Sequence, residues 1–165
     1  MYLYGARGVL VEPNPRYAAK LRQMRAGDEV IEAGISTTGQ TSATLIRLTA
    51  DVYNTFDEAN AAHVVSQSAH WLPELRQEIV DRVAVRTTSL EGILKTRFAE
   101  FSPDFMSIDA EGDDYKILSS MNLQRWRPGI ICVEASGHET PQLLEANGYE
   151  MIALTPDNFV YKLRR

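Results

Sequence analysis

Short apolar runs recur along the chain and are separated by turn-forming residues or by stretches with helical spacing. Runs of this kind, bounded by Gly, Pro, Asn or Asp, predict strands. The run at 8–12 is apolar up to its last residue, as in a strand buried on both faces, whereas the run at 41–48 alternates and predicts one solvated face. The predicted strands cover residues 8–12, 29–33, 41–48, 83–86, 104–109, 130–134, 149–154 and 158–163.

Helical spacing and helix start and stop signals predict the helices between these strands. The tetrapeptide at 88–91, Thr-Ser-Leu-Glu, has the form of a capping box. We expect Thr140 to cap a later helix with Pro141 at its first position, and Asn147 with Gly148 to end it. The predicted helices cover 16–25, 58–68, a stretch from the capping box to 98, 113–121, and a last one that begins at 141.

Strands that alternate with helices and close in a hairpin predict an α/β fold. We expect three layers, with a mostly parallel sheet and an antiparallel C-terminal hairpin. No repeat, low-complexity stretch or linker divides the 165 residues, so we expect a single domain over 1–165. This length suffices to bury a sizeable core.

The composition is that of a folded, mildly acidic protein, with 44% hydrophobic and 24% charged residues and a net charge of -5. This charge argues against nucleic acid or an anionic membrane as a partner. The one cysteine excludes an internal disulfide and fits a reducing compartment. No apolar run approaches the roughly 20 residues that cross a membrane. We therefore expect a cytoplasmic protein.

Two predicted strands end in carboxylates, and these ends are the main candidates for a ligand site. Glu12 closes the first strand before Pro13, Asn14 and a second proline, while Asp109 and Glu111 close the strand at 104–109. Ligands of open α/β sheets bind at the carboxyl ends of the strands. A carboxylate such as Glu12 accepts both hydroxyls of a ribose in dinucleotide-binding folds.

The second acidic end allows more than one chemistry. Asp109 and Glu111 lie two residues apart, Glu134 ends the next strand, and His138 lies in the loop after it. Close carboxylates share a proton, bind a divalent cation or line a cofactor pocket. These four residues lack a diagnostic metal-ligand spacing, so the cofactor pocket is favoured and the metal site remains the less favoured alternative.

A series of short motifs along the chain resembles the FkbM-type methyltransferases in residues, order and spacing. The resemblance covers nearly the whole chain from Tyr4 onward, and the segments that carry it are Gly8-Val9-Leu10-Val11-Glu12-Pro13-Asn14-Pro15, Ala33-Gly34-Ile35-Ser36, Thr88-Ser89-Leu90, Ser107-Ile108-Asp109-Ala110-Glu111-Gly112, Arg127-Pro128, Cys132-Val133-Glu134 and Asn147-Gly148-Tyr149. It implies a Rossmann-like fold and methyl transfer from S-adenosylmethionine, usually to a hydroxyl of a sugar or natural product.

The resemblance also implies roles for single residues. Glu12 would bind the ribose hydroxyls of the cofactor, and Asp109 and Glu111 would lie at its methyl-donor end and serve catalysis. The remaining implied positions are Pro13 and Asn14, which shape the ribose pocket, Ile35 and Ser36 near the adenine, and Glu134 and His138 as weaker candidates beside the reacting end. Selection of the small-molecule or glycan acceptor is expected from the polar segment 51–78.

The family's first strand and its glycine-rich turn have no counterpart, since only eleven residues precede Glu12. In the implied fold this strand is central, between those ending at Glu12 and Asp109, and its loss leaves a slot of roughly 10 Å. The flanking strands close up, a second chain supplies a strand, or the sequence is an N-terminally incomplete version of a longer one; we expect the last. Two functions stand as alternatives to methyl transfer: an inactive scaffold, and a metal-dependent hydrolase that uses Asp109 and Glu111.

Overall fold

A computed structural model describes residues 2–135 and 137–164 of the chain. Its contacts divide the chain into two compact units, Met1–Ser89 (unit 1) and Leu90–Arg165 (unit 2). Each unit has its own strands, helices and buried side chains. The expectation of a single domain stays a prediction.

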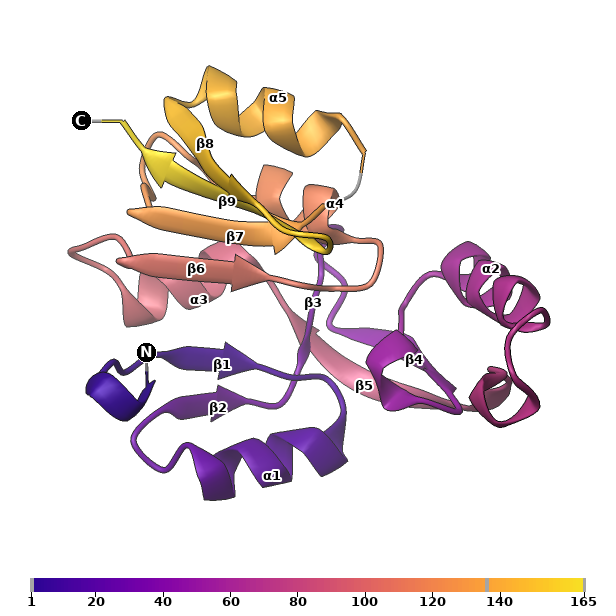
Figure 1. Cartoon of the computed structure of the whole chain (residues 1–165). Coiled ribbons are helices and arrows are strands. Elements are labelled where there is room, and N and C mark those ends of the chain that lie inside the picture. Colours follow the sequence, from indigo (N-terminus) through magenta and orange to yellow (C-terminus); the bar gives the residue numbers. More distant parts are fainter. Residues whose placement is uncertain (1, 136, 165) are drawn as a thin grey trace. The chain divides into compact units, whose positions relative to one another are not determined.

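After a short 3-10 turn η1 (Tyr2–Tyr4), unit 1 continues with a βαβ unit. Strands β1 (Val9–Val11) and β2 (Glu29–Ile31) pair in parallel, and helix α1 (Pro15–Met24) connects them and packs along the pair (Figure 1). Parallel strands of this kind need a crossover helix. Their carboxyl ends therefore lie at one edge, the edge at which Glu12 follows β1.

The remainder of unit 1 is built on a long antiparallel pair, β4 (Ser42–Leu48) and β5 (Ile79–Thr88). The short strand β3 (Gly34–Ile35) pairs in parallel with the end of β5, so the sheet order is β3-β5-β4. Segment 51–78 connects β4 to β5 and contains, in order, η2 (Asp51–Tyr53), α2 (Glu58–Ser68) and η3 (Pro73–Leu75).

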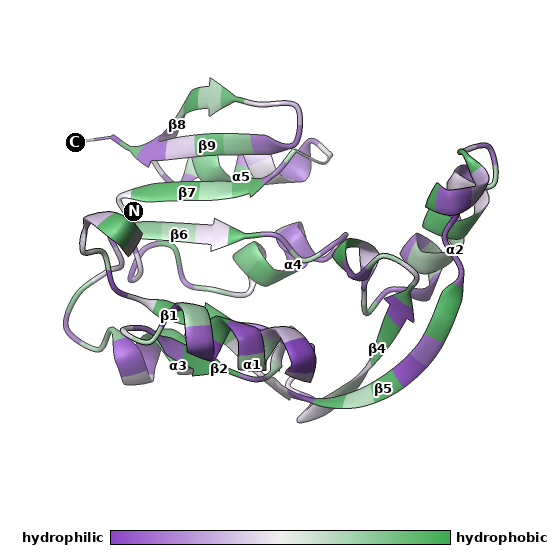
Figure 2. Cartoon of the chain, turned by 60° about the horizontal axis from the view of Figure 1, so that its bottom comes forward, coloured by the Kyte–Doolittle hydropathy of each residue, from purple (hydrophilic) through white to green (hydrophobic). Residues whose placement is uncertain are grey.

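A small apolar core holds this segment on the β4–β5 pair. Ile46 and Leu48 of β4 and Ala61 of α2 are almost fully buried, and the partly buried side chains around them are Tyr53, Val64, Val65 and Ile79. Figure 2 shows that hydrophobic and hydrophilic stretches follow one another along β5. The strand predicted at 41–48 is present as β4, but Leu45 and Ile46 are consecutive and both buried, so the strand does not have the continuous solvated face that its alternating pattern predicted.

Gly34 lies against the ring of Phe56, which belongs to segment 51–78. A Cβ atom at position 34 would come within 2.6 Å of the Phe56 ring. The ring therefore occupies the space in which any other residue would place its side chain. Gly34 is buried at the start of β3, directly before Ile35.

Unit 2 has one four-stranded sheet of order β6-β7-β9-β8. β6 and β7 are parallel, and β9 joins β7 and β8 in antiparallel fashion. The elements of unit 2, in order, are α3 (Leu90–Arg97), β6 (Phe105–Ile108), α4 (Asp114–Ser119), β7 (Ile130–Glu134), α5 (Glu139–Ala146), β8 (Tyr149–Leu154) and β9 (Asn158–Leu163). Among the described residues the sheet ends on one side at β6, whose outer edge makes no strand pair.

The core of unit 2 consists of large side chains from its strands and helices. β7 is mostly hydrophobic along its length (Figure 2). The side chains that are at most 2% exposed include Leu94, Leu118, Trp126, Ile131, Val133, Leu144, Tyr149 and Tyr161. The buried Tyr149 hydroxyl donates to the carbonyl of Pro128 at 3.0 Å, which satisfies its polar end.

These elements confirm the α/β class, with five α-helices and mixed sheets among the described residues, and they confirm the antiparallel hairpin β8–β9. The strands of the described chain form three separate hydrogen-bonded sheets, where one sheet was expected. β5 is longer than predicted because pairing with β4 continues back to Ile79.

The predicted start of the last helix is wrong. α5 begins at Glu139, so Thr140 lies buried inside its first turn and Pro141 is its third residue. The N–H groups of a first helical turn have no partner within the helix, so proline is tolerated there. The predicted stop is confirmed: Asn147 is the C-cap and Gly148 has φ +86°. None of the helices in the described ranges combines the length and apolar character that a membrane span requires.

Candidate functional site

Glu12 lies at the carboxyl end of β1, as the sequence predicts. Its N–H donates to the carbonyl of Ile31 at 3.0 Å, which continues the β1–β2 pairing by one residue. Pro13 then ends the strand, because proline has no N–H for the next hydrogen bond. The chain turns into α1 within two residues, so the carboxylate stays beside the start of the helix.

Neighbouring polar groups hold the Glu12 carboxylate. Its Oε1 accepts the N–H of Asn14 at 2.7 Å. Partial burial raises the pKa of Glu12, the Asn14 hydrogen bond opposes this rise, and the negative charge of Asp51 adds to it. Within the described part of the chain, Oε1 is the Glu12 oxygen that accepts a hydrogen bond, which leaves Oε2 for the hydroxyl of a ligand.

Asn14 caps α1 and has a second polar atom without a partner. Its Oδ1 accepts the N–H of Arg16 at 3.1 Å, the usual hydrogen bond of an N-cap asparagine. The residue is 4% exposed, and its Nδ2 is buried without a hydrogen-bond acceptor in the described chain. Buried donors of this kind normally have a partner. Asn14 thus fits the prediction that the turn after Glu12 shapes a polar pocket.

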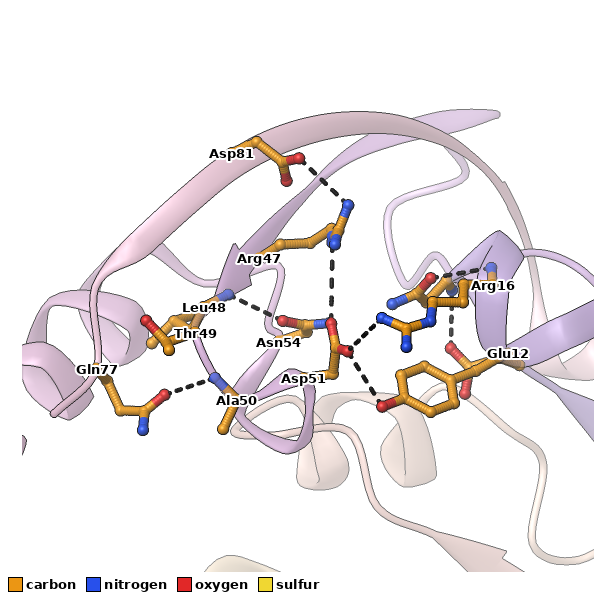
Figure 3. A network of polar contacts seen from close by, with 12 residues as sticks. Glu12, Arg16, Arg47, Leu48, Thr49, Ala50, Asp51, Asn54, Gln77 and Asp81 are labelled. Carbon is orange, nitrogen blue, oxygen red and sulfur yellow. Dashed lines mark hydrogen bonds and ion pairs between the residues drawn. The ribbon is translucent and has the colours of Figure 1, made fainter. Parts of the chain in front are cut away.

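Asp51 lies next to this turn, although no local pattern in the sequence groups it with Glu12. The Tyr17 hydroxyl donates to Asp51 Oδ2 at 3.1 Å. Figure 3 shows the polar network that surrounds Asp51, with Arg16 of α1 and Arg47 of β4 on either side of it. The hydrogen bond to Asp51 raises the pKa of Tyr17.

Ile35 and Ser36, the residues predicted to lie near an adenine, are in unit 1 as well. Ile35 is the second residue of β3, and Ser36 N–H donates to the Thr88 carbonyl at 2.8 Å. Both side chains are half-buried. The structure therefore fixes their backbone through β5, while their predicted role stays a prediction.

The second acidic site forms at the carboxyl ends of β6 and β7 in unit 2. The two strands are in parallel register with Ile108 opposite Val133, so Asp109 and Glu134 follow at neighbouring strand ends. Glu111 adopts φ +50°, in the left-handed region that non-glycine residues rarely occupy, and Gly112 follows at φ +106°. The chain thus turns sharply at Glu111 and Gly112.

Asp114 is a fourth carboxylate of this site. It is the first residue of α4, is 1% exposed, and accepts the Ala110 N–H at 3.2 Å with Oδ1. Its Oδ2 is buried without a hydrogen-bond partner in the described chain. Asp114 therefore fixes the backbone of the turn and brings a further buried carboxylate to the site.

Asp109, Glu111, Asp114 and Glu134 form a carboxylate cluster, in which burial and mutual repulsion raise the pKa values of Asp109, Glu111 and Glu134. Partial burial, followed by the charges of Glu134, Asp109 and Asp114, raises the pKa of Glu111 to about 7. Burial and then the charge of Asp114 raise the pKa of Asp109. The pKa of Glu134 is also raised, mainly by burial. Such shifts are frequent in functional sites.

The described residues do not form the metal site that stood as the less favoured alternative. His138 is the exposed N-cap residue of α5, and no group of three or more His, Cys, Asp or Glu side chains within 2–135 and 137–164 is arranged to hold a metal ion. Asp109, Glu111 and Glu134 come together as carboxylates of one cluster. A cavity of about 190 Å³ elsewhere in unit 2 contains none of the predicted site residues; Ala99, Glu100, Phe101, Ser102, Arg125 and Trp126 line it.

Local sequence patterns thus indicated Glu12, Asn14, Asp109 and Glu111 as candidate site residues. They did not indicate Asp51. Asp51 is 34 residues from Tyr17, and no local spacing rule connects them. The signal for Asp114 was present, because an acidic residue in the first turn of a helix is close to the turn before it.

Comparison with known proteins agrees with the motif series. A family model described as "Methyltransferase FkbM domain" matches residues 1–151 of the 165. No curated protein and no solved structure matches the chain significantly. The family model covers both strand-end sites, those of Glu12 and of the carboxylate cluster. The chain belongs to the FkbM methyltransferase family.

Proposed function

We propose that the protein uses S-adenosylmethionine to methylate a hydroxyl group of a small-molecule or glycan acceptor. Membership of the FkbM methyltransferase family supports methyl transfer in general. The observation that supports S-adenosylmethionine as the cofactor is the position of the Glu12 carboxylate. It follows the first strand of a βαβ unit, and its Oε1 accepts the Asn14 N–H. This is the position at which related α/β folds bind a ribose.

The residues of the Glu12 turn fit an adenosine group. An ionised Glu12 accepts ribose hydroxyls through Oε2, since Oε1 already accepts the Asn14 N–H at 2.7 Å. The buried Asn14 Nδ2 is a donor without a partner in the described chain, and a ligand oxygen would satisfy it. Pro13 limits the turn to few conformations, which lowers the entropy lost on binding.

The carboxylate cluster of unit 2 is suited to receive a proton. S-adenosylmethionine held at the Glu12 turn would supply an electrophilic methyl group, with S-adenosylhomocysteine as the leaving group. The acceptor hydroxyl would lose its proton as it takes the methyl group, and Glu111 or Asp109 would accept that proton, the role that the family resemblance implies for them. A base works best when its pKa is near the working pH, and the pKa of Glu111 is raised to about 7.

The finer fold class belongs to the same proposal. The β1–α1–β2 unit and the parallel pair β6–β7, connected through α4, are the kinds of unit that make up a Rossmann-like sheet. A cytoplasmic location is proposed from the single cysteine, which fits a reducing compartment.

Calorimetric titration with S-adenosylmethionine and S-adenosylhomocysteine tests the cofactor. We expect saturable binding to the wild-type chain, and a loss of about 10- to 100-fold in affinity for Glu12→Gln, because hydrogen bonds to a charged acceptor contribute about 1.5–3 kcal/mol each. Glu145→Gln, an exposed glutamate on α5, is the matched control and should bind as the wild type does.

Two results would contradict the proposal. Absence of binding to the wild-type chain favours the inactive scaffold. Unchanged affinity in Glu12→Gln, with a binding wild type, removes the ribose assignment alone.

A further inference from the structure

Asp51 brings together three separate elements of unit 1. Its Oδ2 accepts the Tyr17 hydroxyl of α1 at 3.1 Å, and its Oδ1 accepts the Asn54 side-chain amide at 3.2 Å. The Asp51 side chain is only 15% exposed. The dashed lines in Figure 3 that reach Asp51 come from α1, from β4 and from the residue after η2.

The cations near Asp51 are farther away than these hydrogen-bond donors. Arg16 and Arg47 approach its oxygens to 3.8 and 3.9 Å, and the Arg16 side chain is 79% exposed. Arg47 also pairs with Asp81 of β5 at 3.2 Å. Solvent screens the pair with the exposed Arg16, and the Arg47 contact at 3.9 Å is longer than a hydrogen bond. The hydrogen bond that joins Asp51 to another element is therefore the one from Tyr17.

The contact with Tyr17 fixes the start of segment 51–78. Asp51 begins η2, and Asn54 at its end accepts the Leu48 N–H at 2.9 Å through Oδ1. The ring of Tyr53, inside η2, lies 6.0 Å from the ring of Trp71 near the far end of α2. A displacement of η2 would therefore also disturb the packing of Trp71, which follows α2.

Tyr17 is also close to Glu12. It lies one turn into α1, the helix whose N-cap, Asn14, donates its N–H to Glu12. The groups that act electrostatically on this corner are Glu12 before α1, Arg16 and Tyr17 on α1, Arg47 on β4 and Asp51 on η2.

We propose that Asp51 is a positioning residue that ties segment 51–78, through the Tyr17 hydroxyl, to the turn that carries Glu12. The inference rests on the proposed function, in which Glu12 binds the methyl donor and segment 51–78 selects the acceptor. Under it, the donor-binding turn and the acceptor-recognition segment are held as one body.

Two substitutions separate the hydrogen bond from the charge. Tyr17→Phe removes the hydroxyl and leaves the aromatic ring. Asp51→Asn removes the negative charge, while its side-chain oxygen still accepts from Tyr17. Asp81→Asn is the matched control, because it removes a carboxylate that also pairs with Arg47 but does not bond to Tyr17.

Amide hydrogen exchange is the first measurement. We expect Tyr17→Phe to speed exchange of the Tyr53, Asn54 and Thr55 amides by about tenfold relative to the wild type, as the loss of one hydrogen bond to a charged acceptor predicts. Those amides donate to Ala50, Asp51 and Ile46. Asp81→Asn should leave them unchanged.

The second measurement is the titration of the Glu12 carboxyl, followed by carbon-13 NMR and assigned with Glu12→Gln. Asp51→Asn should lower the pKa of Glu12, because the charge of Asp51 adds to the rise that burial causes. The pH at which S-adenosylhomocysteine binding is half-maximal should fall with it. A purely structural role of Asp51 would not move this titration.

Unchanged exchange in Tyr17→Phe together with an unchanged Glu12 titration in Asp51→Asn would overturn the inference. Effects of equal size in Asp81→Asn would also overturn the inference, since they would show that removing any nearby carboxylate has the same result. If the wild-type chain does not bind S-adenosylhomocysteine, the proposed function fails, while exchange and titration still decide the role of Asp51.

Discussion

Glu111 combines an unfavourable backbone conformation with an unfavourable charge. Its φ of +50° lies where a non-glycine residue costs about 1–3 kcal/mol. Burial and three neighbouring carboxylates raise its pKa to about 7. Both features weaken the folded state locally, and strain of this kind is concentrated at functional sites. The residue is therefore the most informative single position for measurement.

The pH dependence of stability follows from the direction of this shift. The folded protein binds the Glu111 proton up to about pH 7, whereas the unfolded chain releases it near 4.5, so the free energy of unfolding falls as the pH rises through this interval. Glu111→Gln has no such proton, and we expect it to be more stable than the wild type at pH 8 by on the order of 1 kcal/mol.

Urea unfolding at pH 5 and pH 8 measures this difference. The backbone strain is the same in both proteins, so it cancels in the comparison. The pKa values of Asp109 and Glu134 are also raised, so the free energy of unfolding of Glu111→Gln should still fall as the pH rises, but by less than that of the wild type. Identical pH dependence in Glu111→Gln and the wild type would contradict the prediction.

At the scale of elements, α2 depends on a side-chain cap. Asp57 precedes the helix, and its Oδ1 accepts the N–H groups of Ala59 and Asn60 at 2.7 and 3.1 Å. The helix has few buried residues of its own, so the cap matters for its stability. It also positions the middle of segment 51–78.

Asp57→Ala should lower the free energy of unfolding by about 1 kcal/mol, the usual effect of losing an N-cap. Asp57→Asn is the matched control, because asparagine caps a helix about as well as aspartate does. Urea denaturation checks both variants. Equal loss in the two would mean that the charge of Asp57, rather than its cap, stabilises α2.

At the scale of the whole molecule, each unit buries its own apolar side chains. Leu48 belongs to the core of unit 1, and Leu144 is fully buried in unit 2. A buried leucine replaced by alanine costs about 2–5 kcal/mol. Separate cores make separate opening of the units possible.

We expect Leu48→Ala to speed amide exchange mainly within unit 1, and Leu144→Ala mainly within unit 2. Hydrogen exchange resolved along the sequence distinguishes the two patterns. A uniform loss of protection across both units in either variant would show instead that the chain unfolds as the single domain that its sequence suggests.

The sequence predicted what local patterns determine. The position of most strands and helices, the turn after Glu12 and the hairpin β8–β9 follow from apolar periodicity and from turn residues close in the chain. Pairings between distant residues could not be predicted in this way. The extension of β5 depends on β4, and the link between Tyr17 and Asp51 depends on tertiary packing. The burial of Asp114 depends on tertiary packing as well, whereas local patterns indicate only its place at the start of α4.

The close approach of Gly34 and Phe56 has a consequence for how this sequence can change. The ring fills the place of a side chain at position 34, so a larger residue there requires a smaller one at position 56. Each change made alone creates a clash or a cavity, whereas the two together can preserve the packed volume. The two positions should therefore evolve as a pair, and a change at either is expected to appear with its compensating partner.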